Sequence, residues 1–401
     1  MPPVARPSLA TEPSGPAASE GSRSVFTLVA LGLLPLLLLA AVLYGITLVG
    51  LPNATQVPVE DVWVERTVLA PGEIRLTIRN VGPQDVSISQ VIVNDMLVPF
   101  AIGQEEPLGR LDSTTLAIPF DWVEGEPLAI ALITSNAIKF EAEVAAAVPT
   151  PEVSTETLGL LALLGLYVGA IPVLLGLLWR PLLDRLSENK LNFFLGITVG
   201  LLLFLAAESL FEGFEIAEGI PAVLGGPFLL LAGAAGAFLL LEAASRWSHG
   251  SRSGPTPLVL AALVALGIGL HNFAEGLAIG GAFALGEVAL GAFLVVGFAI
   301  HNTTEGLAIV APVSRTRVGL LTLLGLGLLA GLPTVLGAWM GGLAPSAPLA
   351  LIFLGVGAGA ILQVALAIDR STDRALRAGP GLVGVVLGAL IMYATGLLVS
   401  L

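Results

Sequence analysis

Residues 271–279 read HNFAEGLAI, and residues 301–309 read HNTTEGLAI, so seven of nine positions are identical in two segments 30 residues apart. Both segments lie near the middle of long apolar stretches. A carboxylate at the centre of a membrane helix costs about 2.5–3.5 kcal/mol on insertion scales, so it is rare there without a partner or a task. For one such His–Glu pair, a buried ion pair that only fixes packing and a functional site are equally good interpretations, but two nearly identical pairs predict a shared functional site.

The spacing inside each motif places its histidine and its glutamate on one face of a helix. His271 and Glu275 are four residues apart, as are His301 and Glu305, and this spacing is about one helical turn. The 30-residue offset equals half a helix, a short turn and half of the next helix, which brings both motifs to one depth in an antiparallel pair. Two imidazoles and two carboxylates around one point suit a divalent transition metal, zinc first.

Neighbouring positions add to this predicted site. Asn272 and Asn302 supply oxygen donors for a second, more weakly held ion. Gly276 and Gly306 permit close approach of neighbouring helices.

The composition predicts a membrane protein. The 401 residues are 55% hydrophobic and only 12% charged, whereas soluble domains carry about 25% charged residues. A net charge of −13 and the lack of a basic stripe argue against nucleic acid as a partner. The absence of cysteine excludes disulfides, thiolate metal sites and cysteine nucleophiles.

Hydropathy predicts an all-α polytopic fold, with eight helices in the domain at 157–401 and one additional N-terminal helix. A membrane-spanning helix needs about 20 apolar residues. We interpret 25–50 as an uncleaved transmembrane anchor and 1–24 as a disordered cytoplasmic head. The helices of the domain at 157–401 are predicted near 157–179, 191–211, 227–245, 257–283, 287–312, 318–342, 348–368 and 380–400.

The segment 55–147 has a different pattern and predicts a small extracytoplasmic β-sandwich. Polar and apolar residues alternate over 73–79 and again over 86–91, with a turn signal at Pro71-Gly72 before the first run. A Pro/Thr-containing linker at 148–156 follows. The β domain contains no histidine, so we expect at most a docking or gating cap, and its acidic excess is better explained by a solvated surface than by weak calcium binding.

The distribution of Lys and Arg predicts the orientation. Twelve of the 17 lie in the N-terminal head or in alternate loops of the helical part, and the other five lie in the β domain. Because basic residues concentrate in cytoplasmic loops, the N-terminus is predicted inside, and the β domain and the C-terminus outside.

Two further features allow alternative interpretations. Glu208 and Glu212 share a helix face near the predicted external end and suggest an acidic vestibule that concentrates cations, whereas Glu215 and Glu218 fit either this vestibule or a solvated loop. The Gly337–Gly341 spacing permits a close helix–helix contact, and one interpretation of this contact is a homodimer seam.

At these residues, the chain over 157–401 resembles the ZIP family of divalent-metal permeases, closest to its GufA-like bacterial branch. The family carries a His-Asn-x-x-Glu-Gly motif in its fourth helix and a related one in its fifth, where this chain has the two motifs above. The resemblance implies that His271, Glu275, His301 and Glu305 form the primary transport site. It also implies an adjacent second site at Asn272 and Asn302. Glu208 and Glu212 fall where the second helix of the family carries a His/Glu pair four residues apart.

The chain departs from the family pattern at several positions. Ala274 and Thr304 stand where the family usually has proline before the motif glutamate. Thr334 stands where its sixth helix commonly supplies a glutamate, and Gln363-Val364-Ala365-Leu366-Ala367 replaces an acidic stretch of its seventh. We therefore expect one strong metal site and a weak or absent second one.

The sequence thus predicts a multi-pass plasma-membrane transporter that is not an enzyme and has no cofactor. Its substrate would be Zn²⁺ or another divalent metal, moved to the cytoplasm by alternating access. Uptake should weaken as the pH falls towards about 6.5, the usual histidine pKa. The alternative is an intramembrane zinc hydrolase, against which stand the equivalence of the two glutamates and the lack of an HExxH motif. A third alternative is a metal-responsive receptor, against which stands the lack of an expected cytoplasmic domain that would receive its signal.

Overall fold

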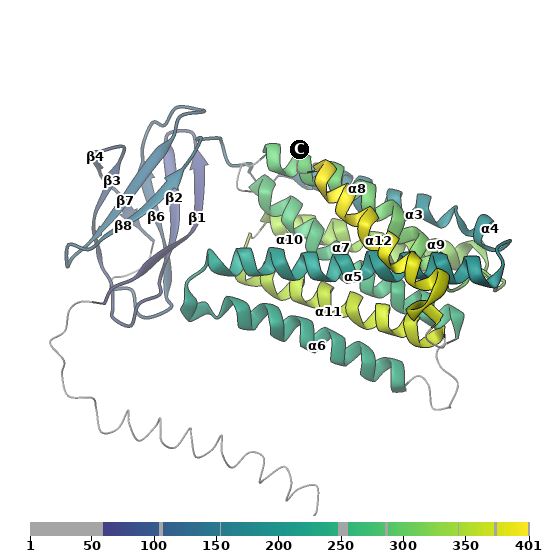
Figure 1. Cartoon of the computed structure of the whole chain (residues 1–401). Helices are drawn as coiled ribbons and strands as arrows, with labels where there is room; N and C mark the ends of the chain where they lie inside the picture. The colour runs from purple at the N-terminus through teal and green to yellow at the C-terminus, as the bar shows by residue number, and fades with distance from the viewer. Residues whose placement is uncertain are drawn as a thin grey trace, which may run out of the picture. The chain divides into compact units, whose positions relative to one another are not determined.

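The computed structural model describes residues 59–103, 107–152, 154–247, 256–284, 288–343, 345–372 and 375–399 (Figure 1). Strands occupy its amino-terminal part, and helices occupy the remainder. The predicted head at 1–24 and the predicted anchor at 25–50 lie outside the described residues.

The strands form two antiparallel sheets of four strands each among the described residues. In the first sheet the spatial order is β1 (Val62–Ala70), β2 (Glu73–Asn80), β6 (Ser113–Pro119) and β5 (Ala101–Ile102). In the second sheet the order is β4 (Met96–Val98), β3 (Ile88–Val93), β7 (Leu128–Thr134) and β8 (Lys139–Val144).

Alternation along the strands builds one core between these two sheets. In β2, Ile74, Leu76 and Ile78 are completely buried, whereas the residues between them are more exposed, as period-two side-chain alternation requires. Residues of the second sheet belong to the same cluster, among them Val91, Val93, Ile130 and Leu132. Two sheets that share one core form a sandwich, as the sequence predicted.

The predicted strand runs and turn are also found, with one shift. The run at 73–79 is β2, and Gly72, at the turn before it, has a φ of +74°, which favours glycine. The run predicted at 86–91 begins as a strand only at Ile88, because Val86 forms an isolated bridge with Leu108 instead.

Each apolar segment predicted in 157–401 is helical. The long helices are α5 (Glu188–Glu218), α6 (Gly226–Trp247), α7 (Pro257–Ala284), α8 (Val288–Val310), α11 (Ala347–Ser371) and α12 (Gly379–Val399). The remaining elements are α2 (Thr155–Gly165), η1 (Leu166–Ala170), α3 (Ile171–Leu177), α4 (Arg180–Leu183), η2 (Ala222–Leu224), α9 (Leu320–Gly331), α10 (Pro333–Leu343) and η3 (Ala375–Arg377). Within the described residues, six helical segments are long and apolar enough to cross a membrane: 155–183, 188–218, 222–246, 257–284, 320–343 and 347–371.

Two of these six segments are interrupted at a proline. In the first, η1 is a π-helix in which the amide of Ile171 donates to the carbonyl of Leu166, and Pro172 follows directly. In the segment 320–343, α9 ends at Gly331 and α10 begins at Pro333. Because proline has no amide hydrogen and its ring clashes with the preceding turn, a regular α-helix cannot continue through it.

Glycines bring α7 and α10 into backbone contact. A Cβ on Gly276 would lie 2.1 Å from the carbonyl oxygen of Thr334, and one on Gly337 would lie 2.0 Å from that of Phe273. Gly341 meets α7 in the same way, 2.2 Å from the carbonyl oxygen of Leu277. The Gly337–Gly341 face is therefore occupied inside the chain, which corrects its interpretation as a homodimer seam.

Helix α8, which carries the second motif, makes a close glycine contact with α3. A Cβ on Gly306 would lie 2.6 Å from the Cα of Gly176 in α3. Helix α7 contacts α8, α9, α10 and α11, while α12 packs along α5 and α11 along α6 (Figure 1). The six polar residues of the two motifs are buried among these helices: His271, Asn272, Glu275, His301, Asn302 and Glu305.

Candidate metal centre

Helices α7 and α8 bring the two motif histidines to the same depth. His271 lies 13 residues before Ala284, the end of α7, and His301 lies 13 residues after Val288, the start of α8. The two helices are neighbours in sequence and in space. The predicted juxtaposition of the motifs is therefore found.

Three side chains converge closely enough to share an ion. One ligand atom each from His271, Glu275 and His301 lie within 4.8 Å of one another. The three residues are 6%, 5% and 9% exposed. Two imidazole nitrogens and a carboxylate oxygen are the ligand types that bind Zn²⁺ in proteins.

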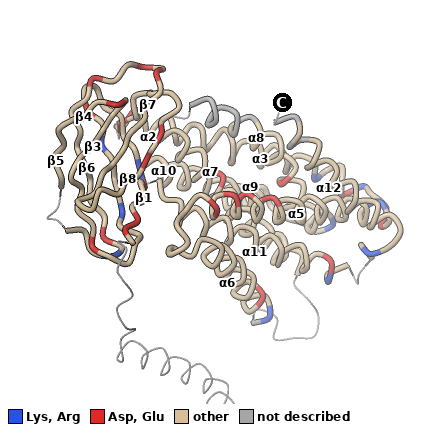
Figure 2. The backbone as a smooth tube through the Cα atoms, turned by 60° about the vertical axis from the view of Figure 1, so that its left-hand side comes forward, with Lys and Arg blue, Asp and Glu red and all other residues tan. Residues whose placement is uncertain are grey.

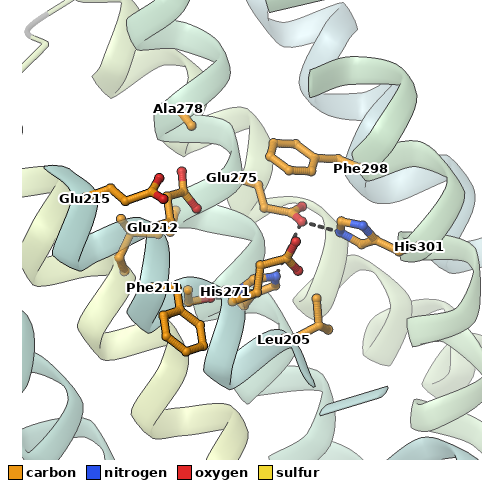
Figure 3. A pocket seen from close by; sticks show the side chains of 13 residues that line it. Leu205, Phe211, Glu212, Glu215, His271, Glu275, Ala278, Phe298 and His301 are labelled. Atoms are coloured by element: carbon orange, nitrogen blue, oxygen red, sulfur yellow. Dashed lines mark hydrogen bonds and ion pairs between the residues drawn. The ribbon is translucent and has the colours of Figure 1, made fainter. Parts of the chain in front are cut away.

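Glu275 lies between the two imidazoles (Figure 3). Its Oε1 is 2.5 Å from Nε2 of His301 and 3.4 Å from Nε2 of His271. On the far side of the His271 ring, Nδ1 is 3.3 Å from the Ser209 hydroxyl, so Nε2 is the nitrogen that faces Glu275. A contact from the second ring nitrogen orients a metal-binding imidazole.

Glu305, predicted as the fourth ligand, is not part of this group of three. Its Oε2 accepts a hydrogen bond of 3.0 Å from Nδ2 of Asn272, and its Oε1 is buried without a hydrogen-bond partner among the described residues. The two glutamates are therefore not equivalent, although the motifs that contain them are. The structure brings together three of the four predicted ligands.

The motif asparagines use their amide nitrogens rather than their oxygens. Nδ2 of Asn302 donates to Oε2 of Glu275 at 3.0 Å, which mirrors the bond from Asn272 to Glu305. Each Oδ1 is buried without a hydrogen-bond partner in the described part of the chain. Each asparagine therefore holds the glutamate of the other motif.

A cavity of about 360 Å³ opens beside the three ligands. Glu208, Glu212 and Glu215 of α5 line it, together with His271, Glu275 and His301 (Figure 3). Phe211 and Phe298 contribute to its apolar wall. The predicted position of Glu208 and Glu212 beside the site is thus found, Glu215 joins them, and Glu218 is exposed outside the lining.

Sequence reasoning missed a polar cluster that joins α6 and α11. Glu242 accepts hydrogen bonds from Arg370 at 2.8 and 2.9 Å, from Arg246 at 2.9 Å and from Gln363 at 3.3 Å. The i,i+4 spacing of Glu242 and Arg246 was a visible signal. The other two partners are more than 100 residues away in sequence, and no local pattern indicates them.

Two more buried polar residues belong to the surrounding helices, and only the first of them was singled out from the sequence. Thr334 is completely buried, and its hydroxyl has no hydrogen-bond partner among the described residues. Ser209, which contacts His271, was not identified, and its place beside Glu208 on a helix was the available signal.

The chain was also compared with known proteins. No family model matches it, and no curated protein matches it. The multi-pass helical architecture and the geometry of the three ligands therefore carry the functional argument.

Proposed function

We propose that this protein transports a divalent metal cation, Zn²⁺ first, across the membrane towards the cytoplasm. The observation that carries the proposal is the convergence of His271, Glu275 and His301 inside the helical bundle. Buried polar side chains in a membrane protein mark substrate and ion pathways. The resemblance of the two motifs to the ZIP family supports the same assignment.

The acidic cavity supports a route to the site. Glu208, Glu212 and Glu215 line the same cavity as the ligands, so a cation attracted by their charge reaches His271 and Glu275 without crossing a packed layer. Three protein ligands would leave a tetrahedral Zn²⁺ one further position for water or another ligand. A transported ion needs access to its site from one side at a time, and in this proposal the cavity is the access from one side.

Ion capture and proton release are linked at the site. The short contact between His301 and Glu275 is a hydrogen bond and requires a proton between the two atoms. A dication that takes both atoms as ligands displaces this proton, which leaves an imidazolium ring altogether or moves to Nδ1 of a neutral ring. In either case the ligand atoms bind the cation only when they carry no proton, so binding competes with acid. Release to the other side then requires the helices around the site to shift, as in alternating access.

The charge distribution supports the orientation. The basic residues of the helical part gather at one end of the bundle, and acidic residues of α5 and α7 lie within it (Figure 2). At the basic end, Arg180 donates to the carbonyls of Thr316 and Val318, and Arg315 donates to that of Leu186. By the positive-inside rule this end of the bundle faces the cytoplasm in the proposed orientation.

An intramembrane zinc hydrolase is the second candidate. The observation that favours it is that the three ligands border a cavity with additional carboxylates, because catalytic zinc sites have three protein ligands and keep a water position. In that case metal would stay bound through many turnovers and product would form. Flux without product separates the transporter from the hydrolase.

The test is Zn²⁺ uptake into proteoliposomes that contain the full chain. We expect uptake by the wild type and its loss in His271→Ala and Glu275→Gln. The matched control is His249→Ala, which removes the third histidine of the chain and should leave uptake unchanged. Equal uptake by the wild type and both site variants would refute the proposal.

A further inference from the structure

Each motif asparagine places its amide nitrogen between two acceptors. Nδ2 of Asn302 donates to Oε2 of Glu275 at 3.0 Å and to the carbonyl of Val168 at 3.0 Å. Nδ2 of Asn272 donates to Oε2 of Glu305 at 3.0 Å and to the carbonyl of Ala330 at 3.2 Å. Because both neighbours of each nitrogen are oxygens that only accept, the amide cannot turn over to present Oδ1 there without losing both bonds.

Both backbone carbonyls belong to the interrupted helices. Val168 lies in the π-helix η1, and the residue four positions later, which would supply its α-helical donor, is Pro172. Ala330 is the penultimate residue of α9, just before the break at Pro333. Each asparagine therefore links a glutamate of the opposite motif to a helix interruption.

We propose that Asn302 and Asn272 are positioning residues that couple the metal site to these two interruptions. The inference rests on the proposed function and deepens it, because it assigns the asparagines a role other than metal ligation. Asn302 orients Glu275, which bridges the two imidazoles, and any shift of that carboxylate on binding a cation is carried to η1. Asn272 links Glu305 to the α9–α10 break in the same way, so a shift of the Glu305 carboxylate is carried to that break.

The neighbouring packing makes such coupling effective. Helix α8 contacts α3 through Gly306 and Gly176, and α7 contacts α10 through Gly276 and the Thr334 backbone. Each interrupted helix is thus held at backbone distance against the helix of one motif, and at its break it is bonded to one motif asparagine. Interruptions are the places where a helix bends most easily, so they are where a change at the site becomes movement.

An aspartate substitution separates positioning from ligation. Asn302→Asp keeps a side-chain oxygen and adds a negative charge, which should leave Zn²⁺ binding unchanged or tighter if the residue is a ligand. If it is a donor, the new carboxylate loses both hydrogen bonds and faces the oxygens of Glu275 and Val168. The two roles therefore predict opposite changes in affinity.

The experiment measures Zn²⁺ affinity of the purified full chain by competition with a chelating dye. We expect Asn302→Asp to weaken binding by about 10–100-fold, the usual effect of removing a residue that orients a metal ligand. The matched control is Asn189→Asp, which adds the same charge at an exposed position on α5 and should leave affinity unchanged. Unchanged or tighter binding in Asn302→Asp would overturn the positioning role.

Hydrogen–deuterium exchange on the same samples reads out the coupling itself. Saturating Zn²⁺ should change exchange of the wild type at 166–173 and at 328–335, and Asn302→Asp should remove the change at 166–173. If Asn302→Asp does not fold, the wild-type exchange decides alone, and unchanged exchange at both interruptions overturns the inference. A wild type that does not bind Zn²⁺ refutes the proposed function, whereas binding that requires His271 and Glu275 but tolerates Asn302→Asp refutes only this inference.

Discussion

Nε2 of His301 lies 2.5 Å from Oε1 of Glu275, so the closest contact of the candidate metal centre joins a side chain of one motif to a side chain of the other. The histidine and glutamate within the first motif are farther apart, at 3.4 Å. The site is thus a product of the pairing of α7 with α8 and not of either motif alone.

The two motif glutamates should differ in their importance for binding. Removing a residue that only orients a metal ligand weakens metal binding by about 10–100-fold. Glu275→Gln should reduce Zn²⁺ affinity by more than this, because it removes the bridging ligand itself. Glu305→Gln should have an effect within that range, since Glu305 is held by Asn272 outside the group of three. Dye competition on both variants measures the difference, and equal losses would restore the symmetric four-ligand site.

Zn²⁺ binding should release protons and weaken in acid. The two imidazole nitrogens and the carboxylate bind the cation only when they carry no proton, so protonation of these ligands competes with Zn²⁺ and a fall in pH favours the metal-free form. Uptake should decline as the pH falls towards about 6.5 and below, the ordinary range of imidazole protonation. A pH indicator in weakly buffered protein measures the release on Zn²⁺ addition. His301→Ala should release fewer protons, and equal release in that variant would contradict this origin of the proton.

Two glycines of α7 should respond to alanine with opposite signs. A methyl group at Gly276 would meet the Thr334 carbonyl at 2.1 Å, so Gly276→Ala should destabilise the bundle by about 1–3 kcal/mol. Gly281 has no atom within 4 Å of such a group, so Gly281→Ala should stabilise α7 through helix propensity by up to about 1 kcal/mol. Thermal unfolding in detergent compares the variants. A Gly276→Ala protein as stable as Gly281→Ala would show that α10 can retreat from α7 without cost.

The Glu242 cluster should stabilise the contact of α6 with α11 unequally through its two arginines. Arg370 donates two hydrogen bonds to Glu242 across the helices, whereas Arg246 donates one from the same helix and is 77% exposed. Arg370→Ala should therefore lower stability more than Arg246→Ala, whose i,i+4 pair contributes only about 0.3–0.5 kcal/mol. A double-mutant cycle of Arg370→Ala with Glu242→Gln measures the coupling, and a value near zero would contradict the assigned role.

Much of the architecture is readable from local patterns. Alternation over 73–79 specified a strand with one buried face, because side chains of a strand point in turn to opposite sides. The apolar lengths specified the helices of 157–401, since spanning a bilayer requires about 20 apolar residues. The interruption at η1 was harder to anticipate, because the sequence contains Pro172 but does not reveal whether a helix bends, ends or widens there.

The sequence by itself determined that polar residues of two twin motifs meet at one depth within an apolar bundle, because spacing and helix length are local quantities. Only the tertiary structure decided that Glu275 joins both histidines while Glu305 turns to Asn272. That choice depends on how α7 and α8 are rotated about their own axes. The rotation is set by close glycine contacts with α10 and α3, whose residues lie far away in the sequence. Nearly identical motifs therefore acquire different chemistry, because each one is packed against a different neighbour.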